Sequence, residues 1–169
     1  MRGYVVASCV FLWFWSGLIV SSYAQESSLE SEEVVIEKVE VHVSSHGPVV
    51  LLEVGQQAIP IYVDPTVAGS IQGALSGFMF PRPLSHDLMH TILEAYSVKV
   101  DRVFISLKDG IYYGTMTLSL NGHTKIFDSR SSDAIALAIH FHTPIVVSRE
   151  LLESAGKPIP GKEQEKIQL

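Results

Sequence analysis

Residues that interrupt regular structure recur along this chain, and their spacing constrains the fold more than any other feature of the sequence. They separate short runs of apolar residues. These breaks are Gly47-Pro48, Gly55, Asp64-Pro65, Pro81, Pro83, Lys108-Asp109-Gly110, Asn121-Gly122 and Pro144. Proline and glycine are disfavoured inside helices and strands. The breaks therefore mark the boundaries of the elements that the sequence predicts.

The segment before Asp64 predicts three strands. Between Val34 and Val43, apolar and polar residues partly alternate, as is typical of a half-buried strand. Gly47-Pro48 then turns the chain into Val49–Val54, and Gly55 turns it again into Ala58–Val63. Three strands in succession, joined by short turns, indicate an antiparallel start to the fold.

Two helices are predicted next. Asp64-Pro65 is typical of a helix start, with an N-cap followed by proline at the first helical position, and predicts a helix to about Phe78. The prolines around Arg82 exclude helix there, because each disfavours helical geometry in the residue before it. Ser85 is expected to cap a second helix, which extends to about Tyr96.

The second half of the chain predicts a strand meander followed by a long helix. The meander strands are Val98–Leu107, Ile111–Leu120 and His123–Phe127. Asn121-Gly122 is the strongest short hairpin signal. Ser131 or Ser132 is expected to cap a helix over Asp133–His142, followed by a strand, Ile145–Val147, and a Ser148-capped helix to Ala155. The order βββααβββαβα predicts an α+β domain with a largely antiparallel or mixed sheet and packed helices.

Three glycines mark one face of the first predicted helix. Gly69, Gly73 and Gly77 are spaced four residues apart, which places them on one stripe. Each glycine costs a helix about 1 kcal/mol relative to alanine, so the stripe indicates that another part of the structure approaches closely. Tight packing on the sheet or the next helix is one explanation, and a subunit contact or a bound ligand is the other.

The first 24 residues have the pattern of a secretory signal peptide. They contain Arg2, an apolar run from Val5 to Val20, and a small-x-small motif that predicts cleavage between Ala24 and Gln25. This predicts export to the periplasm or the medium, without stable membrane insertion after cleavage. The alternative is an uncleaved membrane anchor, although no basic stop-transfer cluster follows the apolar run.

Cleavage would change the composition of the chain that folds. It would remove Cys9 and both tryptophans and leave 145 residues with 11 basic and 18 acidic side chains. Four of those acids lie in residues 25–33, which predict a flexible acidic tether. Residues 34–156 form the predicted domain, and 157–169 a polar tail. Without cysteine, no disulfide can stabilise the domain. The excess of acidic over basic side chains excludes a strongly basic protein that coats nucleic acid.

No common hydrolase or nucleotide-binding motif is present. Two polar clusters remain as candidate catalytic or binding sites. The first is Arg82-Pro83-Leu84-Ser85-His86-Asp87. Arg82 could bind phosphate, and His86 and Asp87 lie at a predicted helix start, where backbone N–H groups favour anions. Alternatively, Arg82 and Asp87 form a salt bridge and a helix cap.

The second cluster is Asp128-Ser129-Arg130-Ser131-Ser132-Asp133, between a predicted strand and a predicted helix. Asp128 and Asp133 could hold a divalent ion, Mg²⁺ or Mn²⁺, while Arg130 and Ser132 bind phosphate. The structural alternative is that a serine caps the helix, Asp133 interacts favourably with the helix dipole, and Asp128 pairs with Arg130 or Arg82.

Together these clusters resemble the bifunctional nuclease family. The resemblance rests on Phe80–Leu88 and Asp128–Leu137, with support from Ile59-Pro60-Ile61 and Pro144–Ser148, and covers roughly Val39 to Leu152. It implies an α+β fold, hydrolysis of phosphodiester bonds in DNA or RNA, and a homo-oligomer. Two features depart from the family: Ser131 stands where proline is usual, and a signal peptide is unusual.

The sequence therefore supports two hypotheses. In the first, the chain is a metal-assisted nuclease in which Asp128 or Asp133 holds the ion, Arg82 and Arg130 hold phosphate, and His86 is the general acid or base. In the second, it is a non-enzymatic binding or assembly module whose arginine and aspartate clusters are structural, with the glycine stripe at an oligomer interface.

Overall fold

The structure is a computed structural model that describes residues 32–159. The predicted signal peptide, the cleavage site at Ala24 and Gln25, and most of the predicted tether and tail lie outside these residues. Of the predicted tether, Glu33 begins the first strand, and Glu32 forms a bidentate ion pair with Arg149 at 2.6 and 2.7 Å. None of the helices within residues 32–159 is long and apolar enough to cross a membrane.

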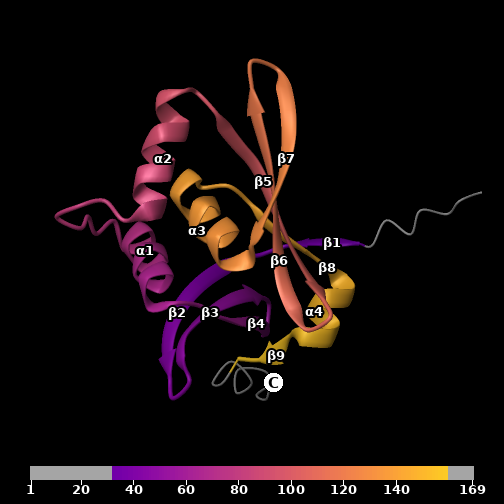
Figure 1. The fold of residues 1–169 in the computed structure, drawn as a ribbon. Helices are drawn as coiled ribbons and strands as arrows, with labels where there is room; N and C mark the ends of the chain where they lie inside the picture. Colours follow the sequence, from indigo (N-terminus) through magenta and orange to yellow (C-terminus); the bar gives the residue numbers. More distant parts are fainter. Residues whose placement is uncertain (1–31, 160–169) are drawn as a thin grey trace, which may run out of the picture.

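Nine strands and four helices make up the described part of the chain and confirm the predicted α+β class (Figure 1). The elements are β1 (Glu33–Val35), β2 (Lys38–Ser44), β3 (Gly47–Val54), β4 (Gln57–Tyr62), α1 (Pro65–Ser76), α2 (Ser85–Ala95), β5 (Lys99–Lys108), β6 (Ile111–Leu120), β7 (His123–Arg130), α3 (Ser131–Phe141), β8 (Ile145–Ser148), α4 (Arg149–Ala155) and β9 (Lys157–Pro158). Compared with the predicted order, β1 and β9 are additional.

The strands form two sheets. One has the order β1-β8-β5-β6-β7 and is antiparallel except for the parallel pair β5 and β8; the other, β2-β3-β4-β9, is antiparallel throughout. The predicted first strand is split between them at Ile36 and Glu37. The Ile36 N–H donates to Ile145 of one sheet, and the Glu37 N–H donates to Glu53 of the other. The chain therefore changes sheets at this point.

Several local predictions are confirmed. Pro65 begins α1 after an N-cap at Asp64, and the Ser148 hydroxyl accepts a hydrogen bond from the Leu151 N–H at 3.1 Å at the start of α4. Asn121 and Gly122 both have positive φ, at 51° and 79°, as the tight hairpin turn between β6 and β7 requires.

Two predicted helix caps are placed differently. Leu84, not Ser85, is the N-cap of α2, where the Asp87 carboxylate accepts a hydrogen bond from the Leu84 N–H at 2.7 Å. Arg130, not a serine, is the N-cap of α3. The reason is that β7 extends three residues beyond Phe127 and passes into α3 without a loop.

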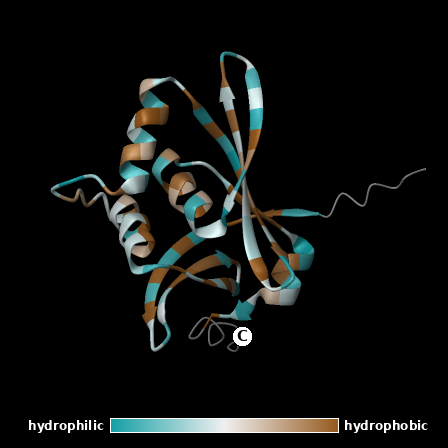
Figure 2. Ribbon diagram, viewed as in Figure 1, coloured by the Kyte–Doolittle hydropathy of each residue, from teal (hydrophilic) through white to brown (hydrophobic). Residues whose placement is uncertain are grey.

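Helix α3 lies at the centre of the domain. Figure 1 shows it between the α1–α2 pair and strands β5 to β7, and it contacts all of these elements. Its residues 134–138, Ala-Ile-Ala-Leu-Ala, are all buried. Figure 2 shows apolar residues along the strands and helices around it. A helix that is apolar on all sides has to be covered on all sides.

The glycine stripe of α1 packs against an aromatic ring. A Cβ on Gly73 would lie 3.0 Å from the Phe80 ring, and one on Gly69 would lie 3.9 Å from it. Gly77 is not on the helix face: it ends α1 in the left-handed conformation, with φ of 69°. The close approach predicted from the glycines therefore comes from the chain that follows α1.

Gly114 on β6 tests the packing of α3 directly. A Cβ there would lie 2.5 Å from the Ala134 Cβ and 3.0 Å from the Arg130 carbonyl, so strand and helix would have to separate. We expect Gly114→Ala to lower the free energy of unfolding by about 1–3 kcal/mol in chemical denaturation. Gly69→Ala is the matched control, because its Cβ meets only an ordinary contact and is expected to raise stability by up to about 1 kcal/mol. Equal stability of the two variants would contradict this account of the packing.

Candidate active site

Arg130 and Asp133 form a bidentate ion pair at the junction of β7 and α3. Arg130 Nε donates to Asp133 Oδ2 at 2.7 Å, and Arg130 Nη2 donates to Asp133 Oδ1 at 2.9 Å. The two residues are three positions apart, so the start of the helix places their side chains on the same side. Parallel N–H···O bonds of this kind fix the geometry of both groups.

His86 reaches the same carboxylate from α2. Its Nε2 lies 3.1 Å from Asp133 Oδ1, and because an ionised carboxylate only accepts, the imidazole donates. The side chain of His86 is 8% exposed. Its Nδ1 makes no hydrogen bond within residues 32–159 and is not sealed from solvent. His86 is thus held at one nitrogen and open at the other.

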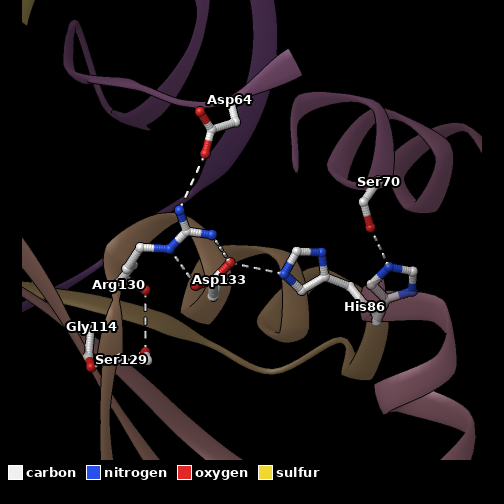
Figure 3. Close-up of polar contacts among 8 residues, drawn as sticks. Asp64, Ser70, His86, Gly114, Ser129, Arg130 and Asp133 are labelled. Carbon is white, nitrogen blue, oxygen red and sulfur yellow. Dashed lines mark hydrogen bonds and ion pairs between the residues drawn. The ribbon is translucent and has the colours of Figure 1, made fainter. Parts of the chain in front are cut away.

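Asp64, the N-cap of α1, completes the cluster. Arg130 Nη1 donates to Asp64 Oδ2 at 3.2 Å, and Figure 3 shows the guanidinium between Asp64 and Asp133. The side chains of Asp64 and Arg130 are 68% and 62% exposed, so this contact is weak compared with the bidentate pair. We call Asp64, His86, Arg130 and Asp133 the junction cluster.

The charges of the junction cluster favour an ionised Asp133. The Arg130 guanidinium holds the pKa of Asp133 below its usual value of 3.8, against the opposing effect of burial, and the hydrogen bond from His86 lowers it further. Hydrogen bonding to Asp133 likewise raises the pKa of Arg130. Near neutral pH Asp133 is therefore ionised and paired with the fixed cation of Arg130.

An open hollow of about 620 Å³ lies beside the junction cluster, with the amino ends of three helices in its wall. The lining comes from the start of α1 (Asp64, Pro65, Thr66, Val67), the start of α2 (Leu84, Ser85, His86), the start of α3 with the residues before it (Ser129, Arg130, Asp133), and the apolar side chains of Met89, Met116 and Leu137. Helix amino ends carry unpaired N–H groups and a partial positive charge. This arrangement suits an anion.

The structure brings only some of the predicted site residues together. His86, Arg130 and Asp133 meet, and the buried Ser132 lines a second hollow of about 610 Å³, which Asp64 and Arg130 also border. Arg82 is exposed on the connection between α1 and α2 and makes no hydrogen bond or ion pair within the described residues.

Asp128 lies on the other face of the sheet from Asp133. Gly114 on β6 faces α3, and the residue opposite it on β7 is Ser129. Because successive strand residues point to opposite faces, Asp128 points away from α3. It is exposed and makes no ion pair among residues 32–159. The predicted pairing of Asp128 with Arg130 or Arg82 is therefore wrong.

The residues present do not fit the predicted divalent ion. Asp128 and Asp133 are on opposite faces of the sheet, and both oxygens of Asp133 are bound by Arg130 and His86. Within residues 32–159 no three histidine, cysteine or acidic side chains are grouped as metal ligands would be. The guanidinium of Arg130 lies between the carboxylates of Asp64 and Asp133, where a divalent cation would have to bind.

Asp87 belongs to a different cluster, on the other side of α2. Besides capping that helix, its carboxylate lies 3.5 Å from His140 Nε2, and Ser70 Oγ lies 3.2 Å from the same nitrogen. His140 also stacks on His90, with ring centroids 5.7 Å apart. Ser70 is buried, so this cluster packs α1, α2 and α3 together.

Comparison with known proteins now places the chain. Residues 49–160 match the bifunctional nuclease domain. The chain belongs to the bifunctional nuclease domain family. It is also similar to uncharacterized proteins from two strains of Mycobacterium tuberculosis, CDC 1551 and H37Rv, each 31% identical over 137 residues, which cover 79% of this chain and 81% of the relative. The predicted resemblance is thus confirmed.

The bifunctional nuclease match covers every residue of the junction cluster. It begins in β3, so β1 and β2 lie before it. Sequence reasoning had assigned Asp64 only as a helix cap and missed it as a partner of Arg130. The Asp64-Pro65 start was a visible signal, but the pairing joins residues 66 positions apart and arises only when the helices pack.

The pH dependence of stability follows from His140. Burial lowers its pKa below the usual 6.5, with Asp87 opposing this effect and His90, His86 and His142 adding to it. Below pH 6.5 the unfolded chain therefore binds a proton that the folded chain does not, and stability falls until the lower folded pKa is passed. We expect the free energy of unfolding to decrease between pH 7 and pH 5, and to decrease less in His140→Gln.

His123 provides the matched control, because it is exposed on β7 and its side chain makes no hydrogen bond or ion pair within residues 32–159. We expect His123→Gln to change the slope of stability against pH less than His140→Gln does. Chemical denaturation at several pH values measures all three proteins. A wild-type slope in His140→Gln would show that another group causes the loss.

Proposed function

We propose that this chain hydrolyses phosphodiester bonds of DNA or RNA at the junction cluster. The observation that carries the proposal is that Asp133 holds His86 and Arg130 together at a hollow lined by three helix amino ends. Membership of the bifunctional nuclease domain family supports it. The predicted role of His86 as general acid or base fits its place in the hollow.

His86 is suited to act as the base. With Nε2–H donated to Asp133, a neutral imidazole has its lone pair on Nδ1, which can accept a proton from an attacking water. Asp133 fixes the ring orientation and stabilises the imidazolium that forms, as a carboxylate does behind a catalytic histidine. The water oxygen bonds to phosphorus, the bond to the leaving oxygen breaks, and solvent protonates that oxygen.

Arg130 is suited to hold the phosphate. Its bidentate bonds to Asp133 fix the guanidinium, while the exposed Asp64 contact at 3.2 Å contributes about 0–1 kcal/mol and can give way to an anion. Arg130 and the backbone N–H groups of the helix starts would then face the charge that develops on the phosphoryl oxygens. The substrate phosphate thus takes over a position that Asp64 holds in its absence.

The proposal makes Asp133 essential and Asp128 dispensable. In a cleavage assay with fluorescent DNA and RNA oligonucleotides, we expect Asp133→Asn and His86→Gln to lower the rate by at least about 100-fold. Asp128→Asn is the matched control, because it removes the same charge from β7, on the face of the sheet that points away from α3. Thermal melting of each variant verifies folding.

Two outcomes would contradict the proposal. One is a wild type that cleaves no faster than Asp133→Asn, with Mg²⁺, with Mn²⁺ and with a chelator; this would favour the predicted binding or assembly module. The other is loss of cleavage in Asp128→Asn alone. The divalent-ion requirement predicted from the sequence is tested by the same three conditions.

A shallow salt dependence is a second expected outcome. Affinity for nucleic acid falls with salt according to the number of phosphates that basic side chains neutralise, with a slope of about −0.7 per phosphate for single strands. Among residues 32–159, Arg130 is the one lysine or arginine side chain that lines the hollow beside the junction cluster. We expect KM to rise by no more than about tenfold for a tenfold increase in salt. A slope several times steeper would indicate that the substrate also contacts other basic residues.

A further inference from the structure

Arg130 borders a second hollow that the proposed chemistry does not use. This hollow has a volume of about 610 Å³ and adjoins the one beside the junction cluster, because Asp64 and Arg130 line both. His86 does not line it. The rest of its wall comes from the end of β4, from the β5–β6 turn with the start of β6, and from the first two residues of α3, Ser131 and Ser132. We call it the serine hollow.

Ser131 and Ser132 are buried polar side chains without hydrogen-bond partners. They are 6% and 8% exposed, and neither hydroxyl makes a hydrogen bond within residues 32–159. Every sealed side-chain oxygen or nitrogen in this part of the chain has a partner, so the two hydroxyls are not sealed, and the serine hollow is an opening that both residues line. A buried hydroxyl without a partner costs free energy. Two of them at one opening indicate that a ligand accepts their hydrogen bonds.

The amino end of α3 adds further donors to the serine hollow. Arg130 is the N-cap of this 11-residue helix, and its side chain has no acceptor with which to cap the N–H groups. The first N–H groups of a helix have no partner within it and carry a partial positive charge. With the two hydroxyls and the guanidinium, they form a group of donors that suits a phosphate.

One carboxylate opposes an anion in the serine hollow. Asp64 is the one acidic side chain, among residues 32–159, that lines it. It is 68% exposed, so water screens its charge, and its contact with Arg130 is long, at 3.2 Å. The donors of α3 and Arg130 therefore still favour an anion.

Two tyrosine rings line the same hollow. Tyr62, at the end of β4, is 60% exposed, and Tyr112, near the start of β6, is half-buried. Burial raises the pKa of Tyr112, so its phenol stays neutral near pH 7. Accessible aromatic rings stack on nucleobases without selecting a sequence. The serine hollow thus places phosphate donors beside aromatic rings, and a nucleotide needs both.

We propose that the serine hollow binds the nucleotide next to the bond that is cleaved. Its phosphate accepts hydrogen bonds from the Ser131 and Ser132 hydroxyls and the amino end of α3, and its base lies against Tyr62 and Tyr112. The position next to the cleaved bond rests on the proposed hydrolysis, because Arg130 lines both hollows. A base that lies against a protein ring is unpaired, so the substrate is a single strand.

Calorimetric titration of the purified full chain tests the serine hollow without any cleavage. The probes are adenosine 5′-monophosphate, adenosine 3′-monophosphate, adenosine and inorganic phosphate. We expect one of the two nucleotides to bind at least about tenfold more tightly than adenosine or inorganic phosphate, because only a nucleotide uses both parts of the hollow.

The serine hydroxyls can be removed with little risk to the fold, since alanine is favourable in a helix. The combined Ser131→Ala and Ser132→Ala variant should weaken nucleotide binding by at least about tenfold, because hydrogen bonds to a charged group are lost. Ser119→Ala is the matched control, because Ser119 lies near the opposite end of β6 from the serine hollow. Circular dichroism verifies that each variant folds.

The tyrosines test recognition of the base. Tyr62→Leu and Tyr112→Leu should each weaken nucleotide binding by at least about fivefold and leave the binding of inorganic phosphate unchanged. Tyr113→Leu is the matched control, because neighbouring residues of a strand point to opposite faces of the sheet. The exposed Tyr62 keeps the test valid if replacement of the half-buried Tyr112 disturbs the fold.

Short substrates test the position of the serine hollow relative to the cleaved bond. Adenosine dinucleotides with no terminal phosphate, with a 5′ phosphate and with a 3′ phosphate contain one internal bond each. We expect one of the two phosphorylated forms to have a kcat/KM at least about tenfold above that of the unphosphorylated form. The combined serine variant should lose this advantage.

Three outcomes would overturn the proposal. They are nucleotides that bind no more tightly than adenosine, nucleotide binding that the combined serine variant leaves intact, and equal cleavage of the three dinucleotides. Serine-dependent nucleotide binding by a chain that cleaves nothing would support the hollow and contradict the hydrolysis. Equal cleavage of the dinucleotides would contradict the hollow and support the hydrolysis, so the two can fail separately.

Discussion

Burial of α3 is the constraint on which the rest of this domain depends. Its five-residue apolar segment from Ala134 to Ala138 cannot face water on any side, so a sheet has to cover one side and other helices the rest. The small alanine side chains allow close packing around α3. Because Gly114 has no Cβ, β6 can approach the helix more closely than any other residue would allow. The covering elements are β5 to β7, α1 and α2.

The junction cluster follows from this arrangement. Since β7 passes directly into α3, the amino end of the buried helix begins at the edge of the sheet, and Arg130 is both the last residue of the strand and the cap of the helix. The first N–H groups of a helix have no partners within it. The amino ends of α1 and α2 come to the same place, and with them Asp64 and His86. Residues from three separate segments therefore meet where the covering of α3 is incomplete.

The sequence predicted most of the helices and strands correctly, but few of the contacts between them. Local signals such as Asn121-Gly122, Asp64-Pro65 and Ser148 act within a few residues, and the structure has the predicted turn or helix start at each. The change of sheet at Ile36 and Glu37 leaves no such signal, because both neighbours continue as strand. The sequence therefore predicted one strand where the fold has two.

Asp128 shows how a small boundary error moves a site residue. Ending the strand at Phe127 put Asp128 in a loop, where its side chain could have turned toward Asp133. The strand in fact continues to Arg130, and its period of two fixes Asp128 on the far face. His86 and Asp133, by contrast, lie in helices whose starts were nearly correct, so both were assigned to the site. Their contact across 47 residues was still not visible in either segment.

Helix α2 connects the chemistry with the outer surface of the domain. An isolated helix of this length is marginal in water, so packing on α3 supplies most of its stability. That packing uses only one side, and His86 is held by it. Because a proton acceptor has to be within hydrogen-bond reach of the attacking water, the packing of α2 on α3 also sets the distance on which the proposed hydrolysis depends.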